Sequence, residues 1–143
     1  MDSQQQQDID ALVNQPHFTA EQRHKARLIM DVYRYVFLEK GQFDRSIPLF
    51  ASRYIQHNPS LPDGIAGLRP WAEGEADRGA RVKFYKLMVD HDLVFVHACV
   101  YRWPGDRGMA VADLFRLENG CVAEHWDVWQ DVPERSANAN TMF

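Results

Sequence analysis

The chain has 143 residues, of which 45% are hydrophobic and 25% are charged, and this is the composition of one globular domain rather than of a disordered, fibrous or membrane-spanning chain. Sixteen basic and twenty acidic side chains give a formal net charge of −4, which argues against a nucleic-acid partner. The sequence lacks a glycine-rich phosphate loop, a Cys-x-x-Cys or His-Glu-x-x-His pattern and a Gly-x-Ser-x-Gly elbow. Nucleotide-driven chemistry and the common zinc sites are therefore not expected.

The cysteines and the N-terminus indicate the compartment. Two cysteines, Cys99 and Cys121, make no disulfide framework, so we expect buried free thiols. Residues 1–10 have neither the cationic start nor the apolar run of a signal peptide, and no apolar stretch approaches the roughly 20 residues that cross a bilayer. We therefore expect a cytoplasmic protein with no membrane partner.

Three segments are predicted along the chain. Residues 1–18 are rich in glutamine and are interrupted by Pro16, so we predict a polar N-terminal arm. Residues 19–135 carry the periodic apolar pattern of a single domain, and residues 136–143 form a C-terminal tail.

The first helix of the domain is predicted to begin at Thr19. The run Thr19-Ala20-Glu21-Gln22 is a capping box, and Gly41 stands where a helix of this length would end. Apolar residues then recur at helical spacing and define one buried face: Ile29, Val32, Tyr33, Val36 and Phe37.

Shorter elements follow. Asp44 is predicted to cap a short helix through Phe50, with Ile47 and Phe50 on its inner side. Residues 54–59 are predicted to be extended because a proline disfavours helix at the residue before it. Residues 61–79 indicate a turn and a helix weakened by internal glycines and a proline.

The second half of the chain changes to the pattern of strands. Four runs rich in Val, Phe, Tyr and Trp are separated by short turns, at residues 81–89, 93–103, 109–117 and 121–130. Helices followed by antiparallel strands are typical of the α+β class.

The turn at residues 118–120 decides which side chains share a face of the sheet. We predict a three-residue loop with Gly120 as a bulge, which pairs Asp113 with His125 and Val111 with Asp127. The alternative is a two-residue Asn119-Gly120 turn, which shifts the register by one and separates Asp113 from His125. A symmetric pairing of the preceding strands would place His97 beside Asp113.

The opposite face of the sheet is predicted to be apolar as well. Its residues would be Val94, Val96, Ala98, Val100, Ala112, Leu114, Trp126 and Val128. Three helices cover only one face of such a sheet, so we expect a second copy of the chain on the other and predict a homodimer.

Asp113 is the strongest candidate for catalysis. An ionisable group on an apolar sheet face costs free energy unless it is paired or functional, and a desolvated carboxylate is suited to proton transfer. His97 and His125 are candidate partners because imidazole exchanges protons near neutral pH. A self-satisfied Asp–His pair that only joins two strands is the structural alternative.

Other polar and aromatic residues are candidates for substrate binding. Asp127 would orient His125 or bind substrate, and His57 and Asn58 offer hydrogen-bonding groups before Pro59. Aromatic residues numerous enough to line a pocket for a flat apolar ligand include Tyr54, Trp71, Phe95 and Trp129. His125-x-Asp127 is similar to part of the facial triad of non-haem iron enzymes, but no histidine follows Asp127 to complete it, so no metal is predicted.

Several motifs occur together in one order: YIQHNP at 54–59, PDG at 62–64, DLVFVH at 92–97, DLFRLENG at 113–120 and EHWDVWQ at 124–130. From about residue 23 to the C-terminus the chain resembles the SnoaL-like polyketide cyclase family of the nuclear-transport-factor-2-like superfamily. The resemblance implies a cone of about three helices on a curved, mainly antiparallel sheet, a deep pocket between them, and dimerisation through the outer sheet face.

The resemblance also implies a chemistry. Relatives include cofactor-free aldol cyclases, a ketosteroid isomerase, scytalone dehydratase and epoxide hydrolases. Asp113 then corresponds to the acid/base carboxylate, with His97 and His125 as partners, while His57 and Asn58 match the motif without an assigned role. The expected function is cofactor-independent aldol cyclisation, isomerisation or dehydration of a small apolar carbonyl compound. Epoxide opening and a non-catalytic ligand-binding module are the alternatives.

Overall fold

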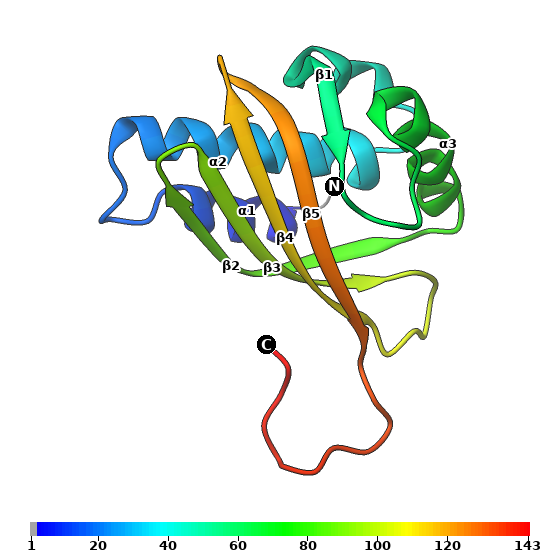
Figure 1. Cartoon of the computed structure of the whole chain (residues 1–143). Coiled ribbons are helices and arrows are strands. Elements are labelled where there is room, and N and C mark those ends of the chain that lie inside the picture. The colour runs from blue at the N-terminus through cyan, green and yellow to red at the C-terminus, as the bar shows by residue number, and fades with distance from the viewer. Residues whose placement is uncertain (1–2) are drawn as a thin grey trace.

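The computed structural model describes residues 3–143. Its helices and strands are α1 (Ser3–Val13), α2 (Ala20–Tyr33), the π-helical turn η1 (Arg34–Leu38), the short 3-10 turns η2 (Phe43–Arg45) and η3 (Ile47–Leu49), β1 (Phe50–Gln56), α3 (Gly64–Asp77), β2 (Arg81–Asp90), β3 (Leu93–Tyr101), β4 (Met109–Glu118) and β5 (Cys121–Asp131). The strands form one sheet in the order β1-β5-β4-β3-β2, in which only β1 runs parallel to its neighbour. Helices pack against one face of this sheet (Figure 1). The predicted α+β class is confirmed.

The capping box at Thr19 starts α2 as predicted. The Gln22 N–H donates to the Thr19 hydroxyl over 3.2 Å, and the Thr19 N–H donates to Gln22 Oε1 over 2.9 Å. The helix continues into η1, and Gly41 follows in the left-handed conformation with φ of 75°. The apolar face shared by α2 and η1 belongs to the hydrophobic core, so these two segments together cover the sheet as one long helix.

The N-terminal segment differs from the prediction. Residues 3–13 form α1 rather than part of a polar arm, and the buried Ile9, Val13 and Phe18 belong to the same core as the sheet. Three buried apolar side chains and the partly buried Leu12 make this contact, and in the sequence they are surrounded mainly by polar residues. Gln15 also joins the domain, since its Nε2 donates to the carbonyl of Leu87 on β2 over 2.9 Å.

The connection to β1 also differs in part. The predicted helix from Asp44 to Phe50 is two separate 3-10 turns, and Ile47 is 42% exposed rather than facing inward, whereas Phe50 is buried. Pro48 near the start of η3 has no N–H to continue a helical ladder, which explains the break. Of the segment predicted to be extended, residues 54–56 form the end of β1, and residues 57–59 lie beyond the strand.

Helix α3 lies within the segment predicted as a weak helix, and it contains Pro70. One of its glycines serves packing: a Cβ at Gly67 would lie 2.6 Å from the Pro62 carbonyl oxygen. The turn before the helix therefore packs directly against the helix backbone. The glycine that allows this contact lowers the helix propensity of the segment.

The β4–β5 hairpin has the two-residue turn that was the alternative. Asn119 and Gly120 both have positive φ, and Glu118 pairs with Cys121, so the predicted three-residue loop was wrong. The register then shifts between Arg116 and Leu117, where β5 accommodates one extra residue.

This irregularity restores the alternation of faces that the tight turn would have reversed. Beyond it Phe115 pairs with His125 and Asp113 pairs with Asp127. The predicted clustering of Asp113, His125 and Asp127 on one face is therefore right, although the predicted pairing was not.

The faces of β3 are the reverse of the prediction. Val96 pairs with Asp113 and Val94 with Phe115, so they lie on the helix-covered face together with Ala98 and Val100. His97 pairs with Ala112 on the outer face.

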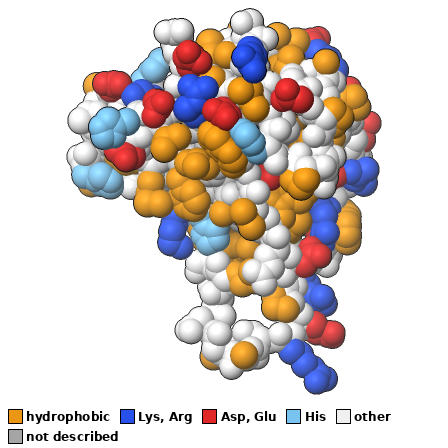
Figure 2. Space-filling view, in the orientation of Figure 1, with side chains coloured by type: hydrophobic (Ala, Val, Ile, Leu, Met, Phe, Trp, Pro, Cys, Tyr) orange, Lys and Arg blue, Asp and Glu red, His pale blue; other side chains and the backbone are white. Residues whose placement is uncertain are grey.

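Figure 2 shows hydrophobic side chains gathered on the face where the strands pass in front of α2 in Figure 1. The strand pairings place Phe95, Leu114 and Trp126 at neighbouring positions of this outer face, together with Val128, which is 73% exposed. The C-terminal Phe143 stacks on Tyr85 with ring centroids 4.5 Å apart, so the tail returns to the outer face. The homodimer stays a prediction.

Both cysteines are free thiols, as expected, although Cys121 is only partly buried. None of the helices formed by residues 3–143 has the length and apolar character that a membrane-spanning segment needs.

Candidate functional site

A cavity lies between the inner face of the sheet and the helical cover. It contains about 970 Å³ of space not filled by atoms, its open mouth included. Its wall is mainly apolar and aromatic, with Phe37 of η1, Trp71 of α3 and Trp129 of β5 among its rings. The ionisable residues of this wall are Tyr33, Tyr54, Glu75, Arg102, Asp113, His125 and Asp127.

Asp113 lies in the floor of the cavity with both carboxyl oxygens engaged. Its side chain projects from β4 and the residue is only 6% exposed. Oδ2 accepts a hydrogen bond from the Tyr33 hydroxyl of α2, and Oδ1 lies 3.0 Å from His125 Nε2. Burial, and then the charge of Asp113, raise the pKa of Tyr33 well above its ordinary value, so this phenol is a donor at neutral pH.

The tautomer of His125 follows from its other neighbour, Gln56. The Gln56 Oε1 atom accepts from the Asn58 N–H over 2.9 Å, and its Nε2 donates to the Tyr54 hydroxyl over 2.9 Å, which fixes the amide orientation. His125 Nδ1 lies 3.1 Å from that same oxygen and must carry a proton to bond with it. The other ring nitrogen, Nε2, lies 3.0 Å from Asp113 Oδ1, so the two side chains form one hydrogen-bonded acid/base pair.

Tyr54 presents a hydroxyl proton to the cavity. The residue is 5% exposed, and burial, followed by the charges of Asp127 and Asp113, raises the pKa of its phenol far above the ordinary value. In residues 3–143, the hydrogen bond to its oxygen is the one donated by Gln56, which leaves the Tyr54 O–H free to donate to a ligand oxygen.

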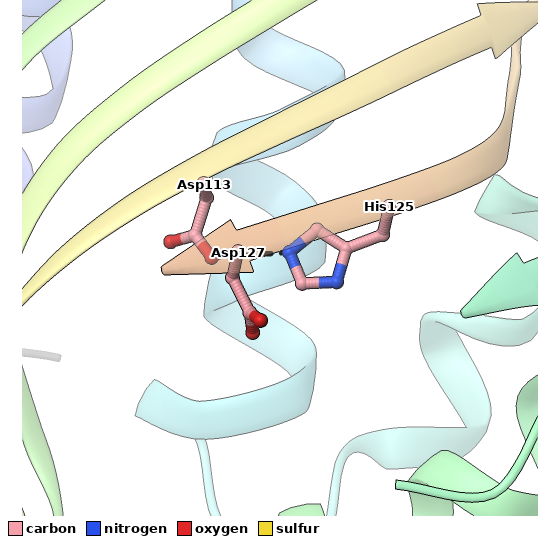
Figure 3. A group of neighbouring side chains, drawn as sticks. All are labelled: Asp113, His125 and Asp127. Carbon is pink, nitrogen blue, oxygen red and sulfur yellow. Dashed lines mark hydrogen bonds and ion pairs between the residues drawn. The ribbon is translucent and has the colours of Figure 1, made fainter. Parts of the chain in front are cut away.

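Asp127 faces Asp113 across the β4–β5 pair (Figure 3). Its Oδ2 accepts from Asn58 Nδ2 over 2.8 Å. Burial raises the pKa of Asp127 above its ordinary value, against the lowering effect of the Asn58 hydrogen bond. The site thus holds two carboxyl groups in different surroundings, one held between Tyr33 and His125 and one partly open to the cavity.

The same three side chains form the group of described residues that has the composition and spacing for a metal ion. Asp113, His125 and Asp127 each offer a ligand atom, and these atoms lie within 4.8 Å of one another. A hydrogen bond joins His125 Nε2 to Asp113 Oδ1, and a metal ion bound here would have to displace the proton of that bond. The absence of a metal stays a prediction.

The structure brings many of the predicted site residues to the cavity. Its wall includes these predicted residues: Asp113, His125, Tyr54, Trp71, Asp127 and Trp129. Asn58 is buried and donates a hydrogen bond to Asp127.

Three predicted site residues lie elsewhere. His97 projects from the outer face, near Tyr85 and Phe143, so its predicted place beside Asp113 was wrong. Phe95 lies on the same outer face. His57 stacks on Trp126 at 4.7 Å and bonds to Glu124 rather than lining the cavity. The error on β3 arose from assuming a symmetric hairpin across a long loop.

Two residues of the site were not predicted as functional. Tyr33 was assigned to the apolar face of its helix, and periodicity alone gives a tyrosine there no polar partner. Gln56 was only part of the extended segment. The available indication for Gln56 was its position one residue before His57. Neighbouring residues of a strand point to opposite faces, so Gln56 and His57 could not both point away from the cavity.

No family model matches the chain, and no curated protein matches it. Solved structures do match. A candidate polyketide cyclase from Bacillus cereus superposes with a TM-score of 0.64 at 16% identity, covering 80% of each chain. A candidate ketosteroid isomerase from Kribbella flavida gives 0.65 at 14% identity, covering 80% of this chain and 84% of that one.

A third match decides the fold. A nuclear-transport-factor-2-like protein from Cytophaga hutchinsonii superposes with a TM-score of 0.58 at 12% identity, covering 74% of this chain and 89% of that one. The chain has the nuclear-transport-factor-2-like fold. At these identities the likeness extends to the fold, which candidate cyclases and a candidate isomerase share, and not to a reaction.

Proposed function

We propose that this protein is a cofactor-independent acid/base enzyme that forms an enolate from a small apolar carbonyl compound. The observation that supports the proposal most is the position of Asp113, a buried carboxyl group in the floor of an apolar cavity, held by Tyr33 and His125. Such an arrangement positions a base without filling the cavity in front of it.

The first step is removal of a proton from the carbon next to the carbonyl group. The Asp113 carboxylate takes the proton, the electron pair of the broken C–H bond forms a carbon–carbon double bond, and the π pair of the carbonyl group moves onto its oxygen. The Tyr54 hydroxyl donates a hydrogen bond to the enolate oxygen, where negative charge develops. His125 and Tyr33 keep the carboxylate oriented throughout.

The enolate then has three outcomes. Return of the proton from Asp113 to another carbon gives isomerisation. Attack of the enolate carbon on a second carbonyl of the same molecule gives aldol closure, with the proton passing to the new alkoxide. Loss of a β-hydroxyl group as water gives dehydration. All three begin with the same proton transfer, so one assay tests them together.

The assay follows exchange of carbon-bound hydrogen for solvent deuterium. Pure protein is incubated with β-tetralone, a flat bicyclic ketone, in deuterium oxide, and the protons next to the carbonyl are followed by NMR. The proposal predicts exchange faster than in buffer containing the same concentration of bovine serum albumin. Equal rates in the two samples, while the ketone binds in the cavity, would overturn it.

Epoxide opening is a second candidate because two carboxyl groups face one cavity. The Asp113–His125 pair would activate water, and Asp127, whose pKa burial raises, would protonate the leaving oxygen. Conversion of indene oxide to its diol without any ketone exchange would favour this reaction. Binding of both compounds without conversion of either would favour a non-catalytic ligand-binding module.

A further inference from the structure

Glu75 is a cavity residue that the proposed chemistry does not use. It lies near the end of α3 and its side chain is 12% exposed. Its Oε1 atom pairs with Arg78 at the surface, whereas its Oε2 atom is buried and, within residues 3–143, has no hydrogen-bond partner. A buried carboxylate oxygen without a donor costs free energy, so it needs an explanation.

The topology places Glu75 at one end of the cavity. Helix α3 ends at Asp77 and the chain enters β2 at Arg81. Val82 pairs with Val100, and Val100 pairs with Met109, and all three line the same cavity. Glu75 therefore lies toward the Met109 end of β4.

Asp113 lies four residues beyond Met109 along β4, which corresponds to about 13 Å at the rise of a strand. The wall between these two levels is apolar and includes Val111 and the stacked rings of Trp71 and Trp129, whose centroids are 5.9 Å apart. This stretch suits a flat apolar body.

The other charged group at the Met109 end is already satisfied. Arg102 bonds to Asp106 through Nε over 3.0 Å and to Asp131 through a second nitrogen over 2.8 Å. Of these charged groups, the Glu75 Oε2 atom is the acceptor left open to a ligand.

We propose that Glu75 binds a hydroxyl group of the substrate at the end opposite the reacting carbonyl, so that the substrate is a hydroxylated, flat, apolar ketone. This inference rests on the proposed function, because the carbonyl must lie at Asp113 and Tyr54. The apolar wall between the two ends follows about 13 Å of β4, and two fused six-membered rings with an oxygen at each end fit along it.

The test compares two ketones that differ by one hydroxyl. The first is β-tetralone, and the second carries a hydroxyl on the aromatic ring at the side far from the carbonyl. Calorimetry should show that the wild-type chain binds the hydroxylated ketone about tenfold more tightly, as expected for one hydrogen bond to a charged group. In Glu75→Met this preference should fall to about one.

Arg78→Met is the matched control, because it removes the exposed partner of Oε1 and leaves the buried oxygen in place. It should keep the tenfold preference. If Glu75→Met does not fold, Glu75→Gln replaces it and should reduce the preference severalfold. Equal affinity of the wild-type chain for both ketones, or an unchanged preference in the folded Glu75 variant, would overturn the proposal.

The two proposals fail separately. A tenfold preference for the hydroxyl without deuterium exchange would keep the binding role of Glu75 and overturn the chemistry at Asp113. Exchange without the preference would keep the chemistry and overturn the binding role.

Discussion

Tyr33 and Asp113 lie 80 residues apart in the chain, and a buried hydrogen bond joins them in the floor of the cavity. The bond connects α2 to the middle of β4, so it links helical cover and sheet at the point where the proposed chemistry occurs. It also holds one oxygen of the carboxylate, while His125 holds the other.

Tyr33→Phe should therefore weaken both stability and activity. Loss of a hydrogen bond to a buried carboxyl group lowers the free energy of unfolding by about 1–3 kcal/mol. We expect deuterium exchange of β-tetralone to slow about tenfold, because the carboxylate loses one of the two groups that orient it. Urea unfolding and the exchange assay measure the two effects. Unchanged values in both would show that the bond does not form in solution.

The two histidines that were predicted as partners of Asp113 should now behave differently. His125→Gln should slow exchange about a hundredfold, since it removes one half of the acid/base unit. His97→Gln, on the outer face, should leave the rate within about twofold of wild type, and it serves as the matched control. The opposite ranking would place the site on the other side of the sheet.

The raised pKa of Asp127 predicts that the stability of the folded protein depends on pH. Burial raises its pKa in the folded protein, so between the unfolded and folded values the folded state binds more protons and stability falls as pH rises. Asp127→Asn keeps an acceptor for Asn58 and removes this ionisation. Thermal melting should therefore show Asp127→Asn more stable than wild type near neutral pH, with the advantage lost at a pH below the ordinary carboxyl pKa. A constant difference across this range would contradict the assignment.

Chelation tests the choice of an acid/base pair over a metal centre. Because His125 Nε2 and Asp113 Oδ1 bond directly, we expect exchange activity to survive dialysis against EDTA unchanged. Added zinc should slow exchange by displacing the proton of the hydrogen bond between His125 and Asp113. Activity that disappears with EDTA and returns with one divalent cation would make Asp113, His125 and Asp127 metal ligands.

The elements predicted correctly are those determined by local chemistry. The capping box at Thr19, the period of α2 and the four apolar strand runs each depend on neighbours within a few residues. Helix α1 was missed because Ile9 and Val13 are too few to stand out among polar residues, and packing rather than propensity orders them.

The site depended on long-range geometry that the sequence indicated only in part. The Asn119-Gly120 turn alone would have separated Asp113 from His125, and the register shift in β5 brought them back to one face. No residue type marks that irregularity in the sequence. The place of His97 depended on the long loop between β3 and β4, whose length leaves the register open.

The most direct test of the account is the exchange rate of Asp113→Asn with β-tetralone. Asparagine has nearly the same shape and cannot take the proton, so exchange should fall at least about a hundredfold while circular dichroism and ketone affinity stay near wild type. A folded Asp113→Asn that binds the ketone and exchanges its protons at the wild-type rate would contradict the central claim.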